Sequence, residues 1–254
     1  MIFYTCVVGG YDSLQPAPPN TGDQFICYSD DQRIRAPGWE VRPLPTNCPS
    51  HPLLANRYVK MHPHLLYPEA DCSTYVDGNI VPKPGAGAHC QQWLAQGDWA
   101  VYQHPLRNTV TAEAEALTKL GLTWAWRLDR QLAGYRHRGF RDDVGLFECN
   151  VLIRRHHVAA VRNLGERWWY ELSTGTVLRD QLSFPMVMQS QPDLRFVNMG
   201  RSDPRHDQIY FDMYFGHSKP YPQIYKLRST VNAAFMMTKK PSQMTQSSSG
   251  LGRV

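Results

Sequence analysis

The sequence lacks long apolar runs and is sparing in charge. Charged residues make up 19% of its 254 positions and hydrophobic residues 42%, a balance typical of globular domains. No stretch approaches the roughly 20 apolar residues needed to cross a bilayer, so we expect no transmembrane segment. Residues 1–8 show neither a basic leader nor a small-residue cleavage site, which favours a first strand over a signal peptide and predicts a cytoplasmic protein.

Patterns typical of zinc sites, nucleic-acid binding and common hydrolases are also missing. The six cysteines include no Cys-x-x-Cys pair, which indicates reduced core residues. The formal charge of +5 is not gathered in a Lys/Arg run, so we expect no nucleic-acid partner, although a basic cleft for a phosphorylated ligand fits. A hydrolase acting on a lipid or glycan is the least favoured alternative, because neither a G-x-S-x-G elbow nor an H-E-x-x-H helix is present.

A short strand followed by an acidic turn is the segment around which the chain is organised. Residues 74–76 (Thr-Tyr-Val) are β-branched or aromatic and predict a buried strand. In the turn that follows, Gly78 is expected to take a backbone angle closed to other residues. The side-chain oxygens of Asp77 and Asn79 predict a site for Mg²⁺ or Mn²⁺ bridged to substrate phosphates. The same three residues are equally those of an ordinary turn.

Strand and helix patterns follow one another along the chain. Strands are expected at residues 2–8, 25–30, 39–44, 100–105 and 144–153, and helices at 55–66 with a break at Pro63, 89–96, 111–120 capped by Thr111, within 124–141, and 156–171. Residues 81–87 are expected to form a loop. The length fits one large α/β domain, which we place at residues 1–237. The polar tail, 238–254, has too little apolar content to pack and is expected to be disordered.

Polar residues near the predicted strand ends are candidates for ligand contacts. The pair Gly9-Gly10 follows the first strand and would let a ligand approach the backbone, and Tyr11 could stack on a base or ring. Arg57 and Lys60 of the predicted helix are expected to lie over a phosphate bound at Asp77. The alternative is that both are solvated surface charges.

Two carboxylates and one polar loop complete the candidate set. Glu148 lies in an apolar strand, where a carboxylate usually has a partner or a task, and the pleat is expected to place Asn150 on its face and Cys149 with Val151 on the other. Asp180 stands between a cation and an amide, where it either starts a helix without further function or serves chemistry. In the loop at 215–221, a histidine could complete a metal shell and a lysine could meet a phosphate.

Five segments, in order, resemble a known family. They are YTCVVGGYD at 4–12, RYVKMHPHLLYPEA at 57–70, YVDGNI at 75–80, HPLRNTVTAEAEA at 104–116 and RDQLSF at 179–184. Together they resemble the glycosyltransferase-like family of the plant turgor-regulation and seed-mucilage proteins, over roughly residues 1–190. The resemblance implies a single GT-A-like (Rossmann-like) domain with a mixed, mostly parallel central sheet flanked by helices. It also implies that the first strand's end meets a nucleotide and that the acidic turn meets a divalent metal.

The resemblance further implies transfer of a sugar from a nucleotide-sugar donor, with a UDP-sugar expected, to a glycan or other hydroxyl acceptor. Donor-binding candidates are then Thr5, Val8, Gly9, Gly10, Tyr11, Asp12, Arg57, Lys60, Asp77, Gly78 and Lys219. Acceptor- or sugar-binding candidates are His104, Trp169, Arg179 and Gln181, and metal candidates are Asp77, Asn79 and His217. Since Asn79 replaces a second carboxylate in the turn, a weak or absent metal requirement is an open alternative.

Asp180 and Glu148 are the catalytic candidates. Either would act as general base on the acceptor hydroxyl if the reaction inverts, or stabilise an oxocarbenium-like state if it retains. The metal and the cations Arg57, Lys60 or Lys219 would neutralise the departing diphosphate. The alternative from another class is a nucleotide- or glycan-binding protein without catalysis. The donor sugar, the acceptor, the stereochemistry and the oligomeric state stay open.

Overall fold

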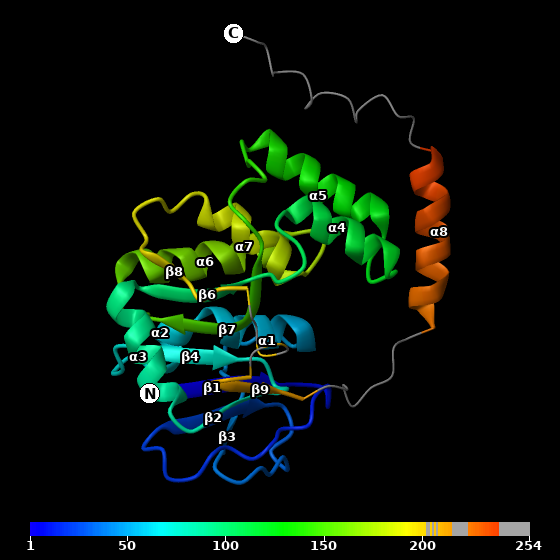
Figure 1. Cartoon of the computed structure of the whole chain (residues 1–254). Coiled ribbons are helices and arrows are strands. Elements are labelled where there is room, and N and C mark those ends of the chain that lie inside the picture. Colours follow the sequence, from blue (N-terminus) through cyan, green and yellow to red (C-terminus); the bar gives the residue numbers. More distant parts are fainter. Residues whose placement is uncertain (202–203, 205, 207, 215–222, 239–254) are drawn as a thin grey trace.

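A seven-stranded sheet forms the centre of the protein in the computed structural model, which describes residues 1–201, 204, 206, 208–214 and 223–238 (Figure 1). The strand order is β3 (Glu40–Pro43), β2 (Gln24–Ser29), β1 (Ile2–Val7), β4 (Ser73–Val76), β7 (Phe147–Arg154), β6 (Trp99–Gln103) and β8 (Phe196–Asn198). A separate two-stranded antiparallel sheet consists of β5 (Ile80–Pro82) and β9 (Phe211–Met213).

The sheet is mixed and mostly parallel, as predicted. Strands β3, β2, β1 and β4 pair in parallel, β7 runs antiparallel to both β4 and β6, and β8 is parallel to β6. All residues of β4 and β7 are buried, because helices cover both faces of the sheet at these central strands. This is the architecture of a single α/β domain.

The described helices are α1 (Pro52–Met61), α2 (Pro63–Leu66), α3 (Ala86–Gln96), α4 (Val110–Lys119), α5 (Ala125–His137), α6 (Ala159–Thr174), α7 (Asp180–Met188) and α8 (Ile224–Thr238). Most of them contribute to one of three apolar clusters. Side chains of α1, α6 and α7 pack on one face of the sheet and those of α3 on the other. A third cluster joins α4, α5 and α7. No helix among the described residues is long and apolar enough to cross a membrane.

Strand β7 departs from the predicted pleat. Its register against β6 shifts after Val101, so that residues 149–151 have no partner in β6. Cys149 packs with α1, α6 and α7, whereas Val151 packs in the cluster that contains α3. The prediction that these two share a face is therefore wrong, because a bulge interrupts the alternation.

Some predicted element boundaries are also wrong. The cap of α4 is Thr109, whose Oγ1 accepts the N–H of Ala112 at 3.1 Å. The expected loop at 81–87 contains β5 and the start of α3. The helix expected from residue 156 begins at Ala159, and α8 extends to Thr238, the first residue of the predicted tail. Residues 239–254 lie outside the described part of the chain.

The order of the strands creates a switch point at the carboxyl ends of β1 and β4. The chain goes from β1 to β2 and β3 on one side, then returns to place β4 on the other side of β1. Ligands of open α/β sheets bind at such a position because the adjoining loops diverge there. The turn at Asp77 follows β4 directly.

Candidate functional site

Four charged side chains from three separate segments meet at this switch point. Lys60 Nζ, from α1, lies 2.6 Å from Asp180 Oδ2 and 3.6 Å from Asp77 Oδ1. The Nε atom of Arg57 lies 3.3 Å from the same Asp180 oxygen. We call Arg57, Lys60, Asp77 and Asp180 the ion cluster. Arg57 and Lys60 were expected near Asp77, and the structure adds Asp180 as their closest carboxylate.

Local structure explains how the ion cluster forms. Arg57 and Lys60 are three residues apart on α1, a spacing that brings side chains to the same side of a helix. Asp180 is the first residue of α7, where the helix dipole favours a carboxylate. Its backbone oxygen accepts the Trp168 indole N–H at 3.3 Å, which fixes the start of α7 against α6.

The ion cluster is closed on one side and open on the other. Lys60 is 1% exposed and Asp180 3%, so each depends on its partners, since an unpaired buried charge is strongly destabilising. The side chain of Asp77 is 36% exposed. Asp77 is therefore the carboxylate of the ion cluster that an incoming ligand can reach.

Asp180 and Arg57 both stay charged near neutral pH. Burial alone would raise the pKa of Asp180, but the charges of Arg57, Lys60 and Arg179 outweigh it and hold that pKa well below its usual range. Burial would lower the pKa of Arg57, and the carboxylates of Asp180 and Asp77 raise it above its ordinary value instead. The site therefore holds fixed charges of both signs.

A second set of polar side chains adjoins Asp180. Gln181 Nε2 donates to Glu148 Oε2 at 3.2 Å, and Glu148 Oε1 lies 3.4 Å from His104 Nε2. His104 Nδ1 accepts the backbone N–H groups of Leu106 and Arg107 at 3.1 Å, and its Nε2 also lies 2.8 Å from Arg107 Nη2.

The carboxylate of Glu113 extends this set to a network. Glu113 is 1% exposed and accepts hydrogen bonds from Arg107 Nε at 2.7 Å and Arg179 Nη2 at 3.1 Å. Arg179 also donates to Gln181. The polar network thus comprises His104, Arg107, Glu113, Glu148, Arg179 and Gln181. It unites Glu148 with three of the four predicted acceptor-binding residues and adds Glu113 and Arg107, which sequence reasoning missed.

Two glycine predictions have different outcomes. Gly9 and Gly10 have φ angles of 63° and 61°, in the left-handed region that side chains disfavour. The N–H of Gly9 donates to both carboxylate oxygens of Asp30, at 3.1 and 3.0 Å. Gly78, in contrast, is not among the residues with positive φ, so the predicted special backbone angle is wrong.

Position 78 is glycine because neighbouring side chains leave no room there for a Cβ atom. A Cβ atom there would lie 2.9 Å from Val7 Cγ2 and 3.0 Å from Asp12 Oδ2. The loop after β1 therefore packs directly on the turn after β4. This contact brings Asp12, a predicted donor-binding residue, beside Gly78, the residue that follows Asp77.

Three predicted contacts are not supported by the structure. Thr5 is fully buried in the middle of β1 on the same face as Phe3 and Val7, because strand alternation turns it into the core. The Val8 side chain is buried in the opposite apolar cluster. Trp169 packs edge-on against Tyr58 and His62, with ring centroids 5.4 and 5.6 Å away, a packing position between α1 and α6.

The oxygen ligands proposed for a metal are partly in place. Asp77 offers its exposed carboxylate, and Asn79 donates its amide N–H to Tyr214 O at 3.1 Å, which leaves the amide oxygen for a cation. No cluster of three or more His, Cys, Asp or Glu side chains suited to a metal occurs among the described residues. His217 and Lys219 lie outside the described residues. Asp77 and Asn79 fit an ion whose remaining ligands are water and substrate phosphates.

Asn150 is a candidate that the sequence pattern did not single out. It is 4% exposed, and in the described part of the chain neither polar atom of its side chain has a hydrogen-bond partner. Its backbone oxygen accepts the N–H of Asp77 at 2.9 Å. A buried, unsatisfied amide beside a ligand site is costly unless a ligand completes its hydrogen bonds.

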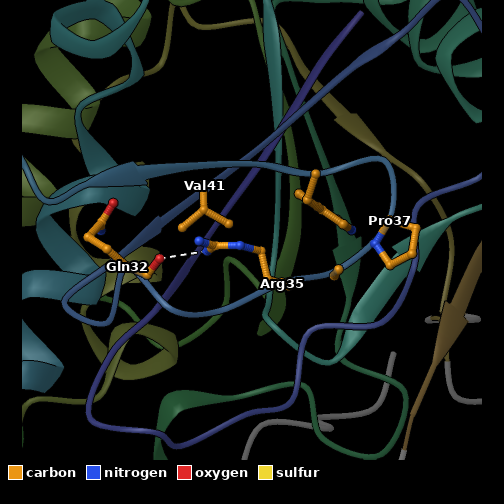
Figure 2. A pocket seen from close by; sticks show the side chains of 6 residues that line it. Gln32, Arg35, Pro37 and Val41 are labelled. Atoms are coloured by element: carbon orange, nitrogen blue, oxygen red, sulfur yellow. Dashed lines mark hydrogen bonds between the residues drawn. The ribbon is translucent and has the colours of Figure 1, made fainter.

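A separate hollow lies beside the loop between β2 and β3. Its volume is about 580 Å³ and it is lined by Gln32, Arg35, Ala36, Pro37, Trp39 and Val41. Figure 2 shows the Arg35 side chain extending toward Gln32, whose backbone oxygen accepts Arg35 Nη1 at 2.6 Å. None of the predicted site residues lines this hollow.

Comparison with known proteins gives one family match. Residues 46–207 match the model of the TOD1/MUCI70 glycosyltransferase-like domain. Curated proteins give no sequence match.

Several solved glycosyltransferases have a related arrangement. Mouse xyloside xylosyltransferase 1 in its apo form is 10% identical, with a TM-score of 0.44, over 78% of this chain and 84% of that one. The galactosyltransferase LgtC, in complex with donor and acceptor sugar analogues, is 13% identical, with a TM-score of 0.46, over 95% of this chain and 98% of that one.

Proposed function

Because the chain belongs to the TOD1/MUCI70 glycosyltransferase-like domain family, we propose that it transfers a sugar from a nucleotide-sugar donor to a hydroxyl acceptor. The observation that carries the proposal is the meeting of Asp77, Lys60, Arg57 and Asp180 at the switch point of the sheet. Glycosyl transfer needs positive charge beside the departing diphosphate and negative charge beside the sugar carbon. The ion cluster offers both, in a GT-A-type donor site for which a UDP-sugar is the expected ligand.

Lys60 and Arg57 would supply the positive charge on the side of the site where the diphosphate departs. Lys60 is held by two carboxylates and Arg57 by Asp180, so neither cation has to be oriented when the donor binds. Preorganised charge of this kind stabilises a transition state without reorganisation at the moment of reaction.

A divalent metal would be held by Asp77 and Asn79. Bound there, Mg²⁺ or Mn²⁺ would supply further positive charge to the phosphates. The ammonium of Lys60 already lies 3.6 Å from Asp77 Oδ1 and supplies such charge itself. The charge of Lys60 therefore supports the alternative of a weak metal requirement, which the replacement of a second carboxylate by Asn79 also suggests.

Asp180 and Glu148 would take different roles. The pKa of Asp180, well below its usual range because of Arg57 and Lys60, makes its carboxylate a poor acceptor of an acceptor-hydroxyl proton at neutral pH. It suits stabilisation of an oxocarbenium-like state. Glu148, held by Gln181 in the polar network, is the candidate base should the reaction invert.

The polar network would form the acceptor side of the site. Arg179 presents a side chain that is 38% exposed while Glu113 fixes its orientation. Asn150 could donate to and accept from sugar hydroxyls, since its amide has no partner in the described residues. Sugar sites are typically built from such fixed polar groups.

A nucleotide- or glycan-binding protein without catalysis is the second candidate. Two observations favour it: the turn holds a single carboxylate, and Asp180 is engaged by two cations. Such a protein would bind the donor but release no product.

Thermal melting tests the proposed donor site. At about 100 times its dissociation constant, a ligand that binds only the folded state adds about 2.7 kcal/mol. We expect one nucleotide diphosphate or nucleotide sugar to raise the melting temperature, and Asp77→Ala to lose the rise. Asp193→Ala is the matched control, because Asp193 is exposed on a distant loop. No rise with any nucleotide, with or without Mn²⁺, would contradict the donor site.

A further inference from the structure

Helix α1, which carries Lys60, ends in a way that leaves the Lys60 carbonyl without a helical partner. In a longer helix, this carbonyl would accept the N–H of His64, four residues on. Pro63 breaks the helix between the two residues. Lys60 is 1% exposed, and a buried backbone acceptor without a donor is costly. The carbonyl therefore needs a donor from elsewhere in the fold.

Two buried side chains of the central sheet supply donors. Arg154, the last residue of β7, donates from Nη2 to Lys60 O at 2.9 Å and also to the hydroxyl of Tyr4. Tyr4, in β1, donates its hydroxyl to the same Lys60 carbonyl at 3.2 Å. Burial raises the pKa of Tyr4 above its usual value, so the hydroxyl keeps the proton that it donates. We call Arg154, Tyr4 and the Lys60 carbonyl the α1 anchor.

The guanidinium of Arg154 is committed to the α1 anchor. Arg154 is 1% exposed, and its Nε and Nη1 have no hydrogen-bond partner among the described residues. Its Cζ lies 5.1 Å from the centre of the Trp99 ring. A buried cation often adds no more stability than an apolar side chain of similar volume would. The directed hydrogen bonds at the end of α1 are what an apolar side chain could not reproduce.

Lys60 itself links the α1 anchor to the ion cluster. Its carbonyl belongs to the anchor, while its ammonium lies 2.6 Å from Asp180 Oδ2 and 3.6 Å from Asp77 Oδ1. The ammonium also lies 5.0 Å from the centre of the Tyr75 ring, and that ring packs edge-on against Tyr4 at 5.4 Å. Lys60 is thus held at both ends, and the anchor sets the point from which its side chain reaches the carboxylates.

We propose that Arg154 is a positioning residue that acts through Lys60, with the Tyr4 hydroxyl as its partner. It holds the Lys60 carbonyl and thereby places the ammonium beside the diphosphate of the donor, a role that rests on the function proposed above. Both anchor side chains are buried, so neither touches the ligand. Misplacement of a site group by about 1 Å can cost about 100-fold in rate, so loss of the anchor should weaken the site from a distance.

Isothermal titration of the full chain with UDP tests this role. Tyr4→Phe removes one hydroxyl and keeps the ring, and it should weaken UDP binding about fivefold, the factor that corresponds to one hydrogen bond of ordinary net strength. Arg154→Met removes both hydrogen bonds of the guanidinium and should weaken binding about tenfold. Arg154→Lys keeps a cation at the carbonyl and should recover part of that loss. Tyr4→Phe decides the test if Arg154→Met does not fold.

Tyr135→Phe is the matched control. Tyr135 is also 1% exposed, and its hydroxyl accepts a hydrogen bond from Gln131 Nε2 at 2.7 Å in the cluster formed by α4, α5 and α7. Removal of this hydroxyl should lower the melting temperature about as much as Tyr4→Phe does and leave the affinity for UDP unchanged. An equal loss of UDP affinity in both variants would overturn the proposal, because it would follow from destabilisation alone.

A double-mutant cycle separates positioning from a purely structural role. In a Lys60→Met background, Tyr4→Phe should cause no further loss of UDP affinity, because the α1 anchor acts only through the ammonium of Lys60. Equal losses with and without that ammonium would overturn the role, as would unchanged UDP binding in Tyr4→Phe and Arg154→Met. A parent that binds no UDP would overturn the proposed donor site together with this role, whereas the other outcomes leave the donor site standing.

Discussion

At the scale of single residues, the site depends on Lys60. Its ammonium is almost fully buried and bridges the two carboxylates of the ion cluster. A buried ion pair adds little net stability over an apolar replacement of both partners, but removal of one partner leaves an uncompensated charge. The cluster is therefore expected to be sensitive to single substitutions.

Lys60→Ala should lower the free energy of unfolding by about 3–5 kcal/mol, because Asp180 then keeps one cation instead of two. Urea unfolding measures the loss. The control is Lys83→Ala, since Lys83 pairs with Asp212 at 3.3 Å between side chains that are both more than a third exposed; its loss should be at most about 1 kcal/mol. Similar losses for both variants would show that Lys60 is not held as described.

Asp180 should impose a dependence of stability on pH. Its pKa in the folded protein lies below the unfolded value of about 3.9, so the unfolded chain binds more protons in acid. The stabilisation is therefore present above pH about 4 and is lost as pH falls below it. The difference in unfolding free energy between the parent and Asp180→Asn should shrink from pH 6 to pH 3. A constant difference would contradict the assignment.

At the scale of elements, the fit between two turns decides the shape of the donor site. The turn after β4 packs against the loop after β1 through Gly78, and the residues in contact are Val7 and Asp12. The two loops belong to strands that pair in parallel, so their ends meet at one edge of the sheet. A small side chain at the contact would separate them.

Gly78→Ala should lower the unfolding free energy by about 1–3 kcal/mol, as overpacking does, and should weaken nucleotide binding. Gly134→Ala is the matched control, because Gly134 lies within α5 with nothing within 4 Å of the added Cβ; it should stabilise the protein by up to about 1 kcal/mol. Unchanged stability in Gly78→Ala would show that the two turns are not in contact.

Elements that local signals define were predicted well. The strand at 74–76, the turn after it and the helix break at Pro63 were read from residue type and spacing. The bulge of β7 could not be predicted, because it depends on pairing with β6, about fifty residues earlier in sequence. Gly78 was recognised, but for a backbone angle and not for the neighbour that requires it.

At the scale of the whole molecule, the candidate site is assembled from distant segments. Sequence reasoning placed Arg57 and Lys60 near Asp77 and identified Asp180 separately, and the pairing of Lys60 with Asp180 across 120 positions came only from the fold. Glu113 lies in the predicted helix at 111–120, and only the fold shows that it is a buried anchor for two arginines. Long-range partners of this kind leave no local pattern in a sequence.

Product analysis by mass spectrometry tests the central claim most directly. The protein is incubated with nucleotide sugars, UDP-sugars first, and a panel of saccharide acceptors. We predict release of the nucleoside diphosphate together with an acceptor heavier by one sugar residue, and loss of both products in a folded Asp180→Asn variant. Nucleotide binding without any glycosylated product, in the parent as in the variant, would contradict the claim and leave a binding protein built on a transferase fold.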